Sequence, residues 1–298
     1  RGQALVLEGC EVIVNEVGTA PCMVMHKDGV TVISMPGVPF EMKWLMTNRV
    51  LPMVERMRGG GEIIHKTIGV FGIPESTLAE KISDWEDALP EYIRLAYLPK
   101  AGIVRLRLSA FGSNRNEMQS VIDRKVDELK QIIGDNIFTE NGESLSEAVG
   151  RLLLQKHETV ATAESCTAGL VAHRIVETAG ASAWLKGGVV AYSNEIKESV
   201  LGVSHDILAT VGAVSEETAS AMAEGALRIL NSDWAVSTTG ISGPDGGTAE
   251  KPVGLVYIAV AHRNAETVVG KFVFATTREQ HQERTTNQAL FELYKMLR

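Results

Sequence analysis

Residues 161–170 read ATAESCTAGL, and this stretch decides the fold of the second half of the chain. Its apolar start is typical of a strand that ends near Glu164, and the residues that follow can open a helix. Ligands usually bind at such a strand-to-helix junction in an open α/β sheet. Main-chain N–H groups there carry partial positive charge and could bind a phosphate or stabilise an oxyanion. On these residues alone Ser165 is a nucleophile, part of a phosphate cradle, or a helix cap.

Cys166 competes with Ser165 as the nucleophile of this stretch. A helix N-terminus lowers the pKa of a thiol, which favours attack, but small buried cysteines are also common in protein cores. The motif is not G-x-S-x-G, so the nucleophile elbow of the esterases does not apply.

The composition is that of a globular protein with two or three domains. Of the 298 residues, 45% are hydrophobic and 22% are charged, so most of the chain can bury a core. The three cysteines form no C-x-x-C pair, and the seven histidines are scattered. This pattern favours a reducing compartment and predicts neither a metal nor another cofactor. Without a long apolar run or a signal pattern, we expect a cytoplasmic protein and no membrane partner.

The net charge of −8 limits the possible partners. Clustered Lys and Arg are needed to neutralise a phosphate backbone, so the acidic balance argues against nucleic acid. Any anionic substrate must therefore meet a local basic patch. The chain begins with Arg1 instead of Met, which indicates a processed or truncated product.

Residues 1–60 are expected to be the remnant of an N-terminal α/β domain. Two apolar alternations, CMVMH and VTVISM, flank a Lys-Asp-Gly turn and predict a hairpin, because Gly tolerates positive φ. A helix should follow over 40–57. These elements make a poor core by themselves, and the Arg-Gly-Gly-Gly at 58–61 suits a linker.

Residues 62–137 are expected to form a small α+β domain in the order β-α-β-β-α. The strands are IIHKTIGV, YIRLAYL and IVRLRLSAF. Residues 69–72 read GVFG, a G-x-x-G that clamps a nucleic-acid backbone in KH modules. Here it ends a strand, and Pro74 and Glu75 follow where a clamp would want Lys or Arg, so a plain strand end is preferred.

Residues 140–298 alternate helices with strands, which predicts a three-layer α/β domain. The strands are TVATAES, GGVVAYS, WAVSTT, LVYIAVA and ETVVGKFVFA. SLSEAVGRLLLQKH, TAGLVAHRIVETAG, SEETASAMAEGALRIL and the C-terminal segment should be helices.

Three further stretches carry polar groups at predicted strand ends. The first stretch, AYSNEIKESV, contains Tyr192, Asn194 and Lys197. A desolvated Lys can act as a base toward a Ser hydroxyl, and a Tyr can relay a proton. A solvated surface lysine is the alternative for Lys197. STTGISGPDGGTAEKPVG is a loop whose glycines let the backbone approach a ligand, unless it is a plain connection. TTREQHQERTTNQ holds Arg278 and Arg284, which suit phosphate recognition or lie at the surface. Together they indicate a site for a small phosphorylated substrate.

Five ordered blocks over 140–298 resemble the C-terminal domain of the CinA family. They are ATAESCTAGL, GGVVAYSNEIKESVLGV, GAVSEETA, STTGISGPDGGTAEKPVG and the stretch 278–284. The resemblance implies a nicotinamide-nucleotide amidohydrolase of pyridine nucleotide salvage, which converts NMN to nicotinate mononucleotide and ammonia. GTAPCMV and SMPGVPFEMKW resemble the end of the family's molybdopterin-binding-like domain, and 62–137 resembles its KH-like middle domain.

The resemblance also implies a role for individual residues. Ser165 would be the nucleophile, with Lys197 as its base, directly or through Tyr192. The N–H groups of the turn at 165–167 would hold the oxyanion, and Cys166 would be a packing neighbour. Either Arg278 or Arg284 would bind the phosphate. The remaining substrate-binding candidates are Thr167, Asn194, Thr239, Gly240, Gly243, Gly246 and Gly247.

Two departures from the family concern its other activity, ADP-ribose pyrophosphatase. The chain lacks the glycine-rich motif of the first domain, and Cys22 stands where the family usually has Gly. Both speak against that activity, which is an alternative only if the missing part were supplied. A competence-related scaffold or nucleic-acid-associated protein is the other alternative. The expected small-molecule partner is NMN. We also expect the chain to form a homo-oligomer, namely a dimer.

Overall fold

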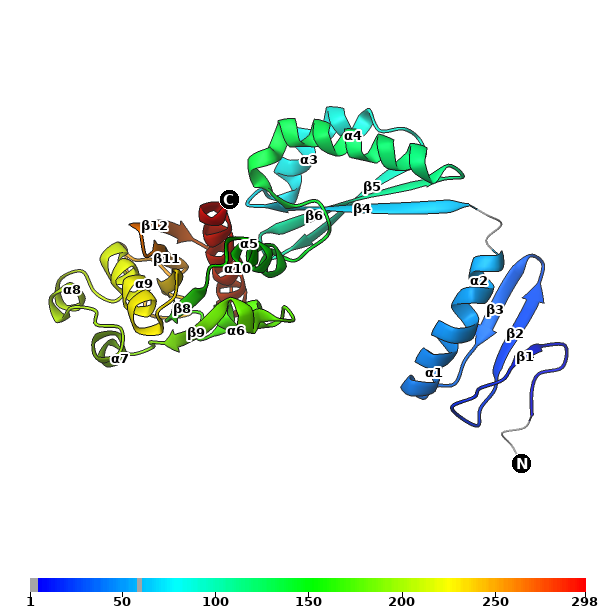
Figure 1. Cartoon of the computed structure of the whole chain (residues 1–298), viewed down its shortest axis with the longest axis horizontal. Helices are drawn as coiled ribbons and strands as arrows, with labels where there is room; N and C mark the ends of the chain where they lie inside the picture. The colour runs from blue at the N-terminus through cyan, green and yellow to red at the C-terminus, as the bar shows by residue number, and fades with distance from the viewer. Residues whose placement is uncertain (1–4, 58–60) are drawn as a thin grey trace. The chain divides into compact units, whose positions relative to one another are not determined.

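The computed structural model describes residues 5–57 and 61–298 (Figure 1). They divide into two compact units. The first runs up to Ile63 and includes Phe111–Arg115, and the second holds Ile64–Ala110 and Asn116–Arg298. Three of the four expected linker residues, Arg58, Gly59 and Gly60, lie outside the described residues. Among the helices of the described ranges, none is long and apolar enough to cross a membrane.

The first unit is built on an antiparallel sheet of β1 (Glu11–Ile13), β2 (Cys22–Lys27) and β3 (Val30–Ser34). The predicted hairpin is confirmed, because Asp28 and Gly29 join β2 to β3 with φ of 49° and 78°, the positive values that a two-residue turn requires. The helix expected over 40–57 is α1 (Pro39–Leu45), a π-helical turn (Met46–Val50) and α2 (Leu51–Met57). The buried core of the first unit is as small as expected: Cys22, Leu45 and Val50 form one cluster, and Val24 is also buried.

The second unit begins with the predicted β-α-β-β-α order, which is confirmed. It consists of β4 (Glu62–Phe71), α3 (Glu75–Asp87), β5 (Ile93–Lys100), β6 (Ile103–Gly112) and α4 (Arg115–Ile133). Both helices cover the same face of the sheet and enclose its core with side chains such as Leu78 and Ile122 (Figure 1). A short strand not predicted from the sequence, β7 (Ile137–Thr139), pairs with β4 and gives the sheet order β5-β6-β4-β7. Three residues are too few to show an alternation.

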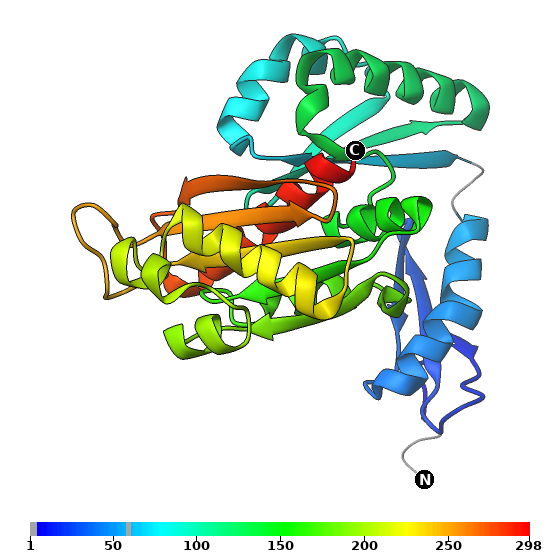
Figure 2. The same cartoon turned by 60° about the vertical axis from the view of Figure 1, so that its left-hand side comes forward.

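The rest of the second unit is the predicted three-layer α/β fold. Its sheet has the order β12-β11-β10-β8-β9; β9, β8 and β10 are parallel, and β11 and β12 are antiparallel. The long helix α9 packs on one face and α5, α6 and α10 pack on the other (Figure 2). The elements are α5 (Leu145–Lys156), β8 (Val160–Glu164), α6 (Leu170–Val176), β9 (Leu185–Val190), α7 (Asn194–Ser199), α8 (His205–Thr210), α9 (Glu216–Leu230), β10 (Trp234–Gly240), β11 (Leu255–His262), β12 (Ala265–Val273) and α10 (Arg278–Leu297).

Local sequence signals explain where these helices begin and how closely they pack. Ser215 caps α9 by accepting from the Thr218 N–H, as predicted. The buried face of α9 is rich in alanine, and a Cβ at Gly225 would lie 2.1 Å from the Leu201 carbonyl oxygen. Small side chains therefore bring α9 close to the sheet and to the segment after α7.

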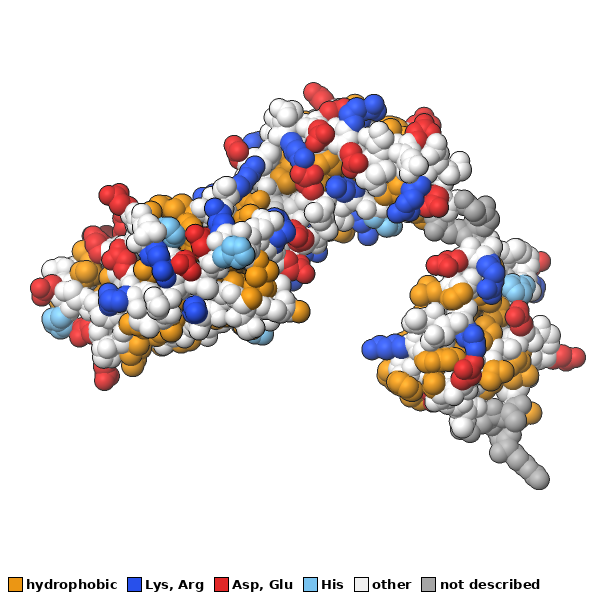
Figure 3. Space-filling view, viewed as in Figure 1, with side chains coloured by type: hydrophobic (Ala, Val, Ile, Leu, Met, Phe, Trp, Pro, Cys, Tyr) orange, Lys and Arg blue, Asp and Glu red, His pale blue; other side chains and the backbone are white. Residues whose placement is uncertain are grey.

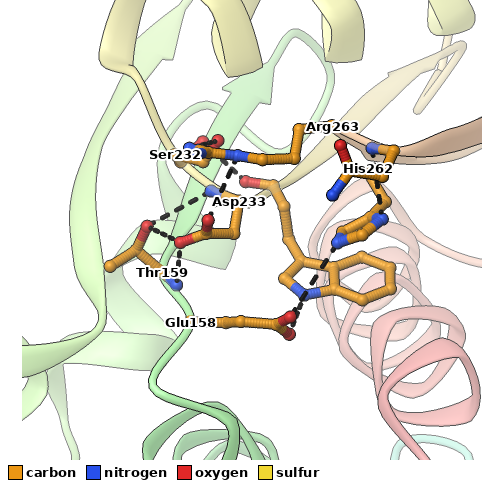
Figure 4. A network of polar contacts seen from close by, with 8 residues as sticks. Glu158, Thr159, Ser232, Asp233, His262 and Arg263 are labelled. Atoms are coloured by element: carbon orange, nitrogen blue, oxygen red, sulfur yellow. Dashed lines mark hydrogen bonds and ion pairs between the residues drawn. The ribbon is translucent and has the colours of Figure 1, made fainter.

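A polar network ties the starts of β8 and β10 together (Figure 4). The Asp233 carboxylate accepts from the Thr159 N–H at 2.8 Å and from its hydroxyl at 2.7 Å, and Arg263 lies 3.1 Å from its other oxygen. Burial by itself would raise the pKa of Asp233, but these partners hold it below the ordinary value. Nearby, the Trp234 indole N–H donates to Glu158 at 2.7 Å. This network fixes the register of the two strands whose opposite ends carry the candidate site.

Candidate active site

The Ser165 turn connects β8 to α6 at the carboxyl end of the central parallel strands. The Ser165 N–H donates to the Thr238 carbonyl of β10 at 2.9 Å, so the turn begins where the sheet pairing ends. Ala168 and Gly169 follow with φ of 52° and 98°. These left-handed conformations reverse the chain within a few residues, and they place Ser165 outside the helix instead of at its cap.

The Glu164 carboxylate occupies the N-terminus of α6. Its side chain is 1% exposed. One oxygen accepts from the Thr167 hydroxyl at 2.6 Å, the Gly169 N–H at 2.9 Å and the Val171 N–H at 3.0 Å, and the other accepts from the Ala172 N–H at 2.9 Å. The helix end is therefore satisfied by the protein's own anion, and it is not a phosphate cradle. Sequence reasoning missed Glu164, although a carboxylate just before a helix was a usable signal.

The turn itself retains donors for a ligand. Within the described part of the chain, the main-chain N–H groups of Cys166 and Thr167 donate to no other residue. Both follow Ser165 directly, where an oxyanion formed by attack of its hydroxyl would lie.

Lys197 lies on α7, and its side chain contacts Ser165. The helix is capped by Ser193, whose hydroxyl accepts from the Ile196 N–H at 3.3 Å. The Lys197 side chain is 1% exposed. Its Nζ lies 3.2 Å from the Ser165 Oγ, 2.8 Å from the Ala191 carbonyl oxygen and 3.3 Å from the Tyr192 carbonyl oxygen. The surface alternative for Lys197 is thus wrong.

Burial lowers the pKa of Lys197, and the nearby Cys166 opposes this shift only in part. The three oxygens around Nζ can accept the three N–H bonds of the ammonium form. In the neutral form, two N–H bonds would donate to the two carbonyl oxygens and the lone pair would accept from the Ser165 hydroxyl. A serine nucleophile with a lysine base would require such a contact.

Cys166 is a buried thiol and not an alternative nucleophile. Burial raises its pKa to about 12, so the thiolate that would attack is not formed near neutral pH. Its carbonyl oxygen accepts from the Gln282 side chain of α10 at 2.9 Å, which ties the turn to that helix.

A cavity of about 200 Å³ opens beside Ser165. Of the predicted site residues it brings together Ser165, Tyr192, Asn194, Lys197, Thr239, Gly240 and Arg278, and it adds Cys166, Ala213, Val214 and Ser242. Thr239 donates its hydroxyl to the Ala213 carbonyl, so it offers a ligand only acceptors. Among the described residues, no group of His, Cys, Asp and Glu is placed to hold a metal ion.

The other predicted residues lie elsewhere. Thr167 is buried against Glu164 and Thr238, and Gly246 and Gly247 are exposed on the loop. Arg284 lines a different cavity, together with Phe71 and Lys100.

Arg278, at the start of α10, connects two walls of the cavity. Its guanidinium donates to the Gly243 carbonyl at 2.9 Å and to the Tyr192 hydroxyl at 3.2 Å. The Tyr192 side chain is 62% exposed, and its hydroxyl lies with Arg278, so it reaches Lys197 only through its main-chain oxygen. The Tyr192 hydroxyl therefore does not lie between Ser165 and Lys197, whose side chains contact each other directly.

His281 fixes the glycine-rich loop against α10. The ring is fully buried, with Nδ1 2.9 Å from the Ser242 hydroxyl and Nε2 3.1 Å from the Gly254 carbonyl. Burial lowers the pKa of His281, and the neutral ring fits both contacts if Nε2–H donates and Nδ1 accepts. Cβ atoms at Gly243 and Gly247 would each lie within 3 Å of Val253, so close packing of the loop on itself requires these glycines. Sequence reasoning missed His281, which lies one helical turn after Arg278.

The first three residues of GVFG, Gly69 to Phe71, are buried at the end of β4, and the exposed Gly72 follows the strand. Phe71 stacks on Phe291 of α10 with ring centroids 4.2 Å apart, and a Cβ at Gly69 would lie 2.4 Å from the Phe138 ring. The segment is therefore not placed as an open backbone clamp.

Fold and site together describe an α/β protein that presents a Ser–Lys pair at the end of its central strand. The chain belongs to the CinA family: residues 142–297 match the model of the CinA C-terminal domain, and residues 65–139 match that of the damage-inducible protein CinA KH domain. It is 44% identical over 296 residues to a CinA-like protein of Flavobacterium psychrophilum, covering 99% of this chain and 71% of that protein. A CinA-like protein of Cytophaga hutchinsonii is also 44% identical, over 99% of this chain and 70% of its own length.

A solved structure resembles just over half of the chain. The competence/damage inducible protein CihA from Agrobacterium tumefaciens is 38% identical, with a TM-score of 0.50, and the match covers 54% of this chain and 100% of that one.

Proposed function

We propose that the chain hydrolyses the carboxamide of nicotinamide mononucleotide to nicotinate mononucleotide and ammonia. The observation that carries the proposal is the buried Lys197 amine 3.2 Å from the Ser165 hydroxyl, with two carbonyl oxygens to accept its N–H bonds. Membership of the CinA family supports it. The relatives are named for competence and DNA damage, so the reaction itself is our inference.

The first half of the reaction acylates Ser165. Neutral Lys197 takes the hydroxyl proton while Oγ attacks the carboxamide carbon, and the resulting oxyanion accepts from the N–H groups of Cys166 and Thr167. When the C–N bond breaks, the Lys197 ammonium gives its proton to the leaving nitrogen, which departs as ammonia. Lys197 is then neutral again beside a Ser165 ester.

Water completes the cycle through the same groups. Lys197 takes a proton from a water molecule that attacks the ester carbon, and the bond to Ser165 Oγ breaks as Lys197 returns a proton to it. The products are a carboxylic acid and the starting enzyme, so the net reaction consumes one water and releases one ammonia.

The cavity suits the reacting end of a nucleotide. Its volume of about 200 Å³ is below the range of about 300–1,000 Å³ that encloses a drug-sized ligand, so only the pyridine amide would be enclosed. Arg278 lies at the rim with N–H groups beyond its two contacts, in position to bind a phosphate that projects outward.

Ammonia release from NMN, nicotinamide and glutamine, measured side by side, tests the proposal. We expect turnover of NMN alone, because the other two amides bring no phosphate to Arg278. Ser165→Ala should lower the rate by several orders of magnitude, whereas Ser199→Ala, which removes an exposed hydroxyl from α7, should retain it. Near-normal turnover by Ser165→Ala would show that the nucleophile is assigned wrongly.

A further inference from the structure

A second cavity of the second unit, away from Ser165, has a cationic lining. Its volume is about 480 Å³. Lys100 and Arg105 come from β5 and β6, and Arg174 comes from α6. Glu283 is the one carboxylate among its described lining residues. In a chain with a net charge of −8, this is the local basic patch that an anionic ligand requires.

The cations of this cavity are incompletely paired. Across residues 5–57 and 61–298, no hydrogen bond or ion pair engages the Lys100 ammonium or the Arg105 guanidinium. Arg174 contacts Glu177 at 3.0 Å and Glu283 at 3.9 Å, yet its Nε is buried without a hydrogen-bond partner. A buried donor without an acceptor is unfavourable, so the chain satisfies the Arg174 guanidinium only in part.

Glu147, whose charge acts on Arg105, is engaged elsewhere. Glu147 closes a capping box with Ser144 at the start of α5, and the Ser144 N–H donates to it at 2.6 Å. The pKa of Glu147 is lowered, first by the Ser144 backbone and side chain and also by the charge of Arg105. The capping box leaves the N–H groups of Leu145 and Ser146, at the first two positions of α5, for a ligand. Both residues line the cavity.

We propose that this cavity binds a small organic phosphate monoester. Guanidinium, ammonium and helix N-terminal N–H groups are the donors that bind phosphate oxygens. The volume exceeds what a phosphate group needs, and apolar side chains such as Leu98, Ile103 and Leu290 line the remainder, which suits the organic part of such a ligand.

The cavity shares two helices with the candidate active site. Arg174 belongs to α6, which begins at the Ser165 turn, and Glu283 lies on α10, which begins with Arg278. A phosphate that draws Arg174 away from Glu283 would therefore act on two helices that build the site. The binding inference does not rest on the proposed reaction.

Phosphate binding measured by calorimetry at low ionic strength tests the inference, with inorganic phosphate as the probe and the full chain. Because Arg278 provides a separate phosphate contact, the parent for the comparison is Arg278→Gln. We expect this variant to bind phosphate, and the added pair Lys100→Gln and Arg105→Gln to weaken its affinity at least tenfold. Arg107→Gln, an exposed position two residues further along β6, is the matched control and should change the affinity less than twofold.

Each other outcome decides against the site. Equal phosphate affinity with and without the Lys100 and Arg105 substitutions, or no binding by Arg278→Gln, overturns the inference. Binding of a single-stranded oligonucleotide but not of phosphate, with the same dependence on Lys100 and Arg105, would identify a nucleic-acid surface instead. Because both substituted side chains are at least partly exposed, the variants should unfold at the temperature of their parent. If the double substitution lowers the unfolding temperature, the single variant Lys100→Glu is used instead. Unchanged phosphate affinity in Lys100→Glu would then overturn the inference.

Discussion

Replacing Glu164 by Gln tests how the Ser165 turn is held. The substitution keeps the shape of the side chain but replaces one acceptor oxygen by an NH2 group. In either orientation of the amide, this group faces at least one N–H or O–H donor of the turn, because both carboxylate oxygens accept. The buried charge that complements the end of α6 is lost as well.

The cost follows from these contacts. One hydrogen bond to a charged group contributes about 1.5–3 kcal/mol, and a carboxylate at a helix N-terminus contributes about 0.3–1 kcal/mol. We therefore expect Glu164→Gln to lower the free energy of unfolding by about 2–4 kcal/mol. Urea denaturation at pH 7 measures the change, and the rate of ammonia release from NMN reports whether the turn still presents Ser165.

Glu177→Gln is the matched control, since Glu177 also belongs to α6 but has an exposed side chain paired with Arg174. It should cost less than about 0.5 kcal/mol. If Glu164→Gln lowered the free energy of unfolding no more than this control does, the Glu164 carboxylate would not be holding the turn.

Three other substitutions test separate parts of the structure. Lys197→Met should reduce NMN turnover by at least about 10²-fold, as expected for loss of a general base. It should lower the unfolding free energy by only about 1–3 kcal/mol, because the buried Ala191 carbonyl loses its donor; activity at wild-type level would exclude Lys197 as the base. In the wild type, the rate should rise with pH through a Lys197 pKa below its ordinary value, since only the neutral amine accepts the Ser165 proton. Asp233→Asn should lower the unfolding free energy by about 1–3 kcal/mol at pH 7. The pKa of Asp233 is lower in the folded state than in the unfolded state. The stabilisation that its carboxylate gives the fold is therefore complete above the unfolded pKa and is lost as pH falls through the folded pKa. If the difference in unfolding free energy between the wild type and Asp233→Asn grew at acid pH, this reasoning would be contradicted. Cys166→Ala should retain NMN turnover within a few-fold, because the thiol is buried and protonated, and loss of turnover without unfolding would restore it as a nucleophile.

The sequence predicted the elements better than it predicted the directions of side chains. Alternation and helical periodicity located β8, β9 and β10 and hence the strand ends that carry Ser165, Tyr192 and Thr239. They could not show that the Tyr192 hydroxyl lies with Arg278, because that contact joins residues 86 positions apart. Pairing of this kind depends on how α10 docks on the sheet.

The two arginines show what spacing can and cannot decide. Arg278 and Arg284 are six residues apart on one helix, and at about 100° per residue they point to different faces. Spacing alone therefore predicts that only one of them reaches a given cavity, but which face of α10 meets the Ser165 turn is a property of tertiary packing. Glu164 was missed for a related reason: a carboxylate before a helix indicates a possible cap, but that its oxygens reach N–H groups as far as Ala172 depends on the path of the turn.

The buried Glu164 carboxylate at the start of α6 also affects the release of product from the candidate site. Glu164 directly precedes Ser165 and engages the N–H groups at the start of α6, so a product carboxylate would meet only the N–H groups of Cys166 and Thr167, beside a second negative charge. A carboxamide enters such a site as a neutral molecule, and the proposed reaction turns it into a carboxylate. The change of charge produced by the reaction itself would weaken the hold of the site on its product, and turnover would then proceed with little inhibition by nicotinate mononucleotide.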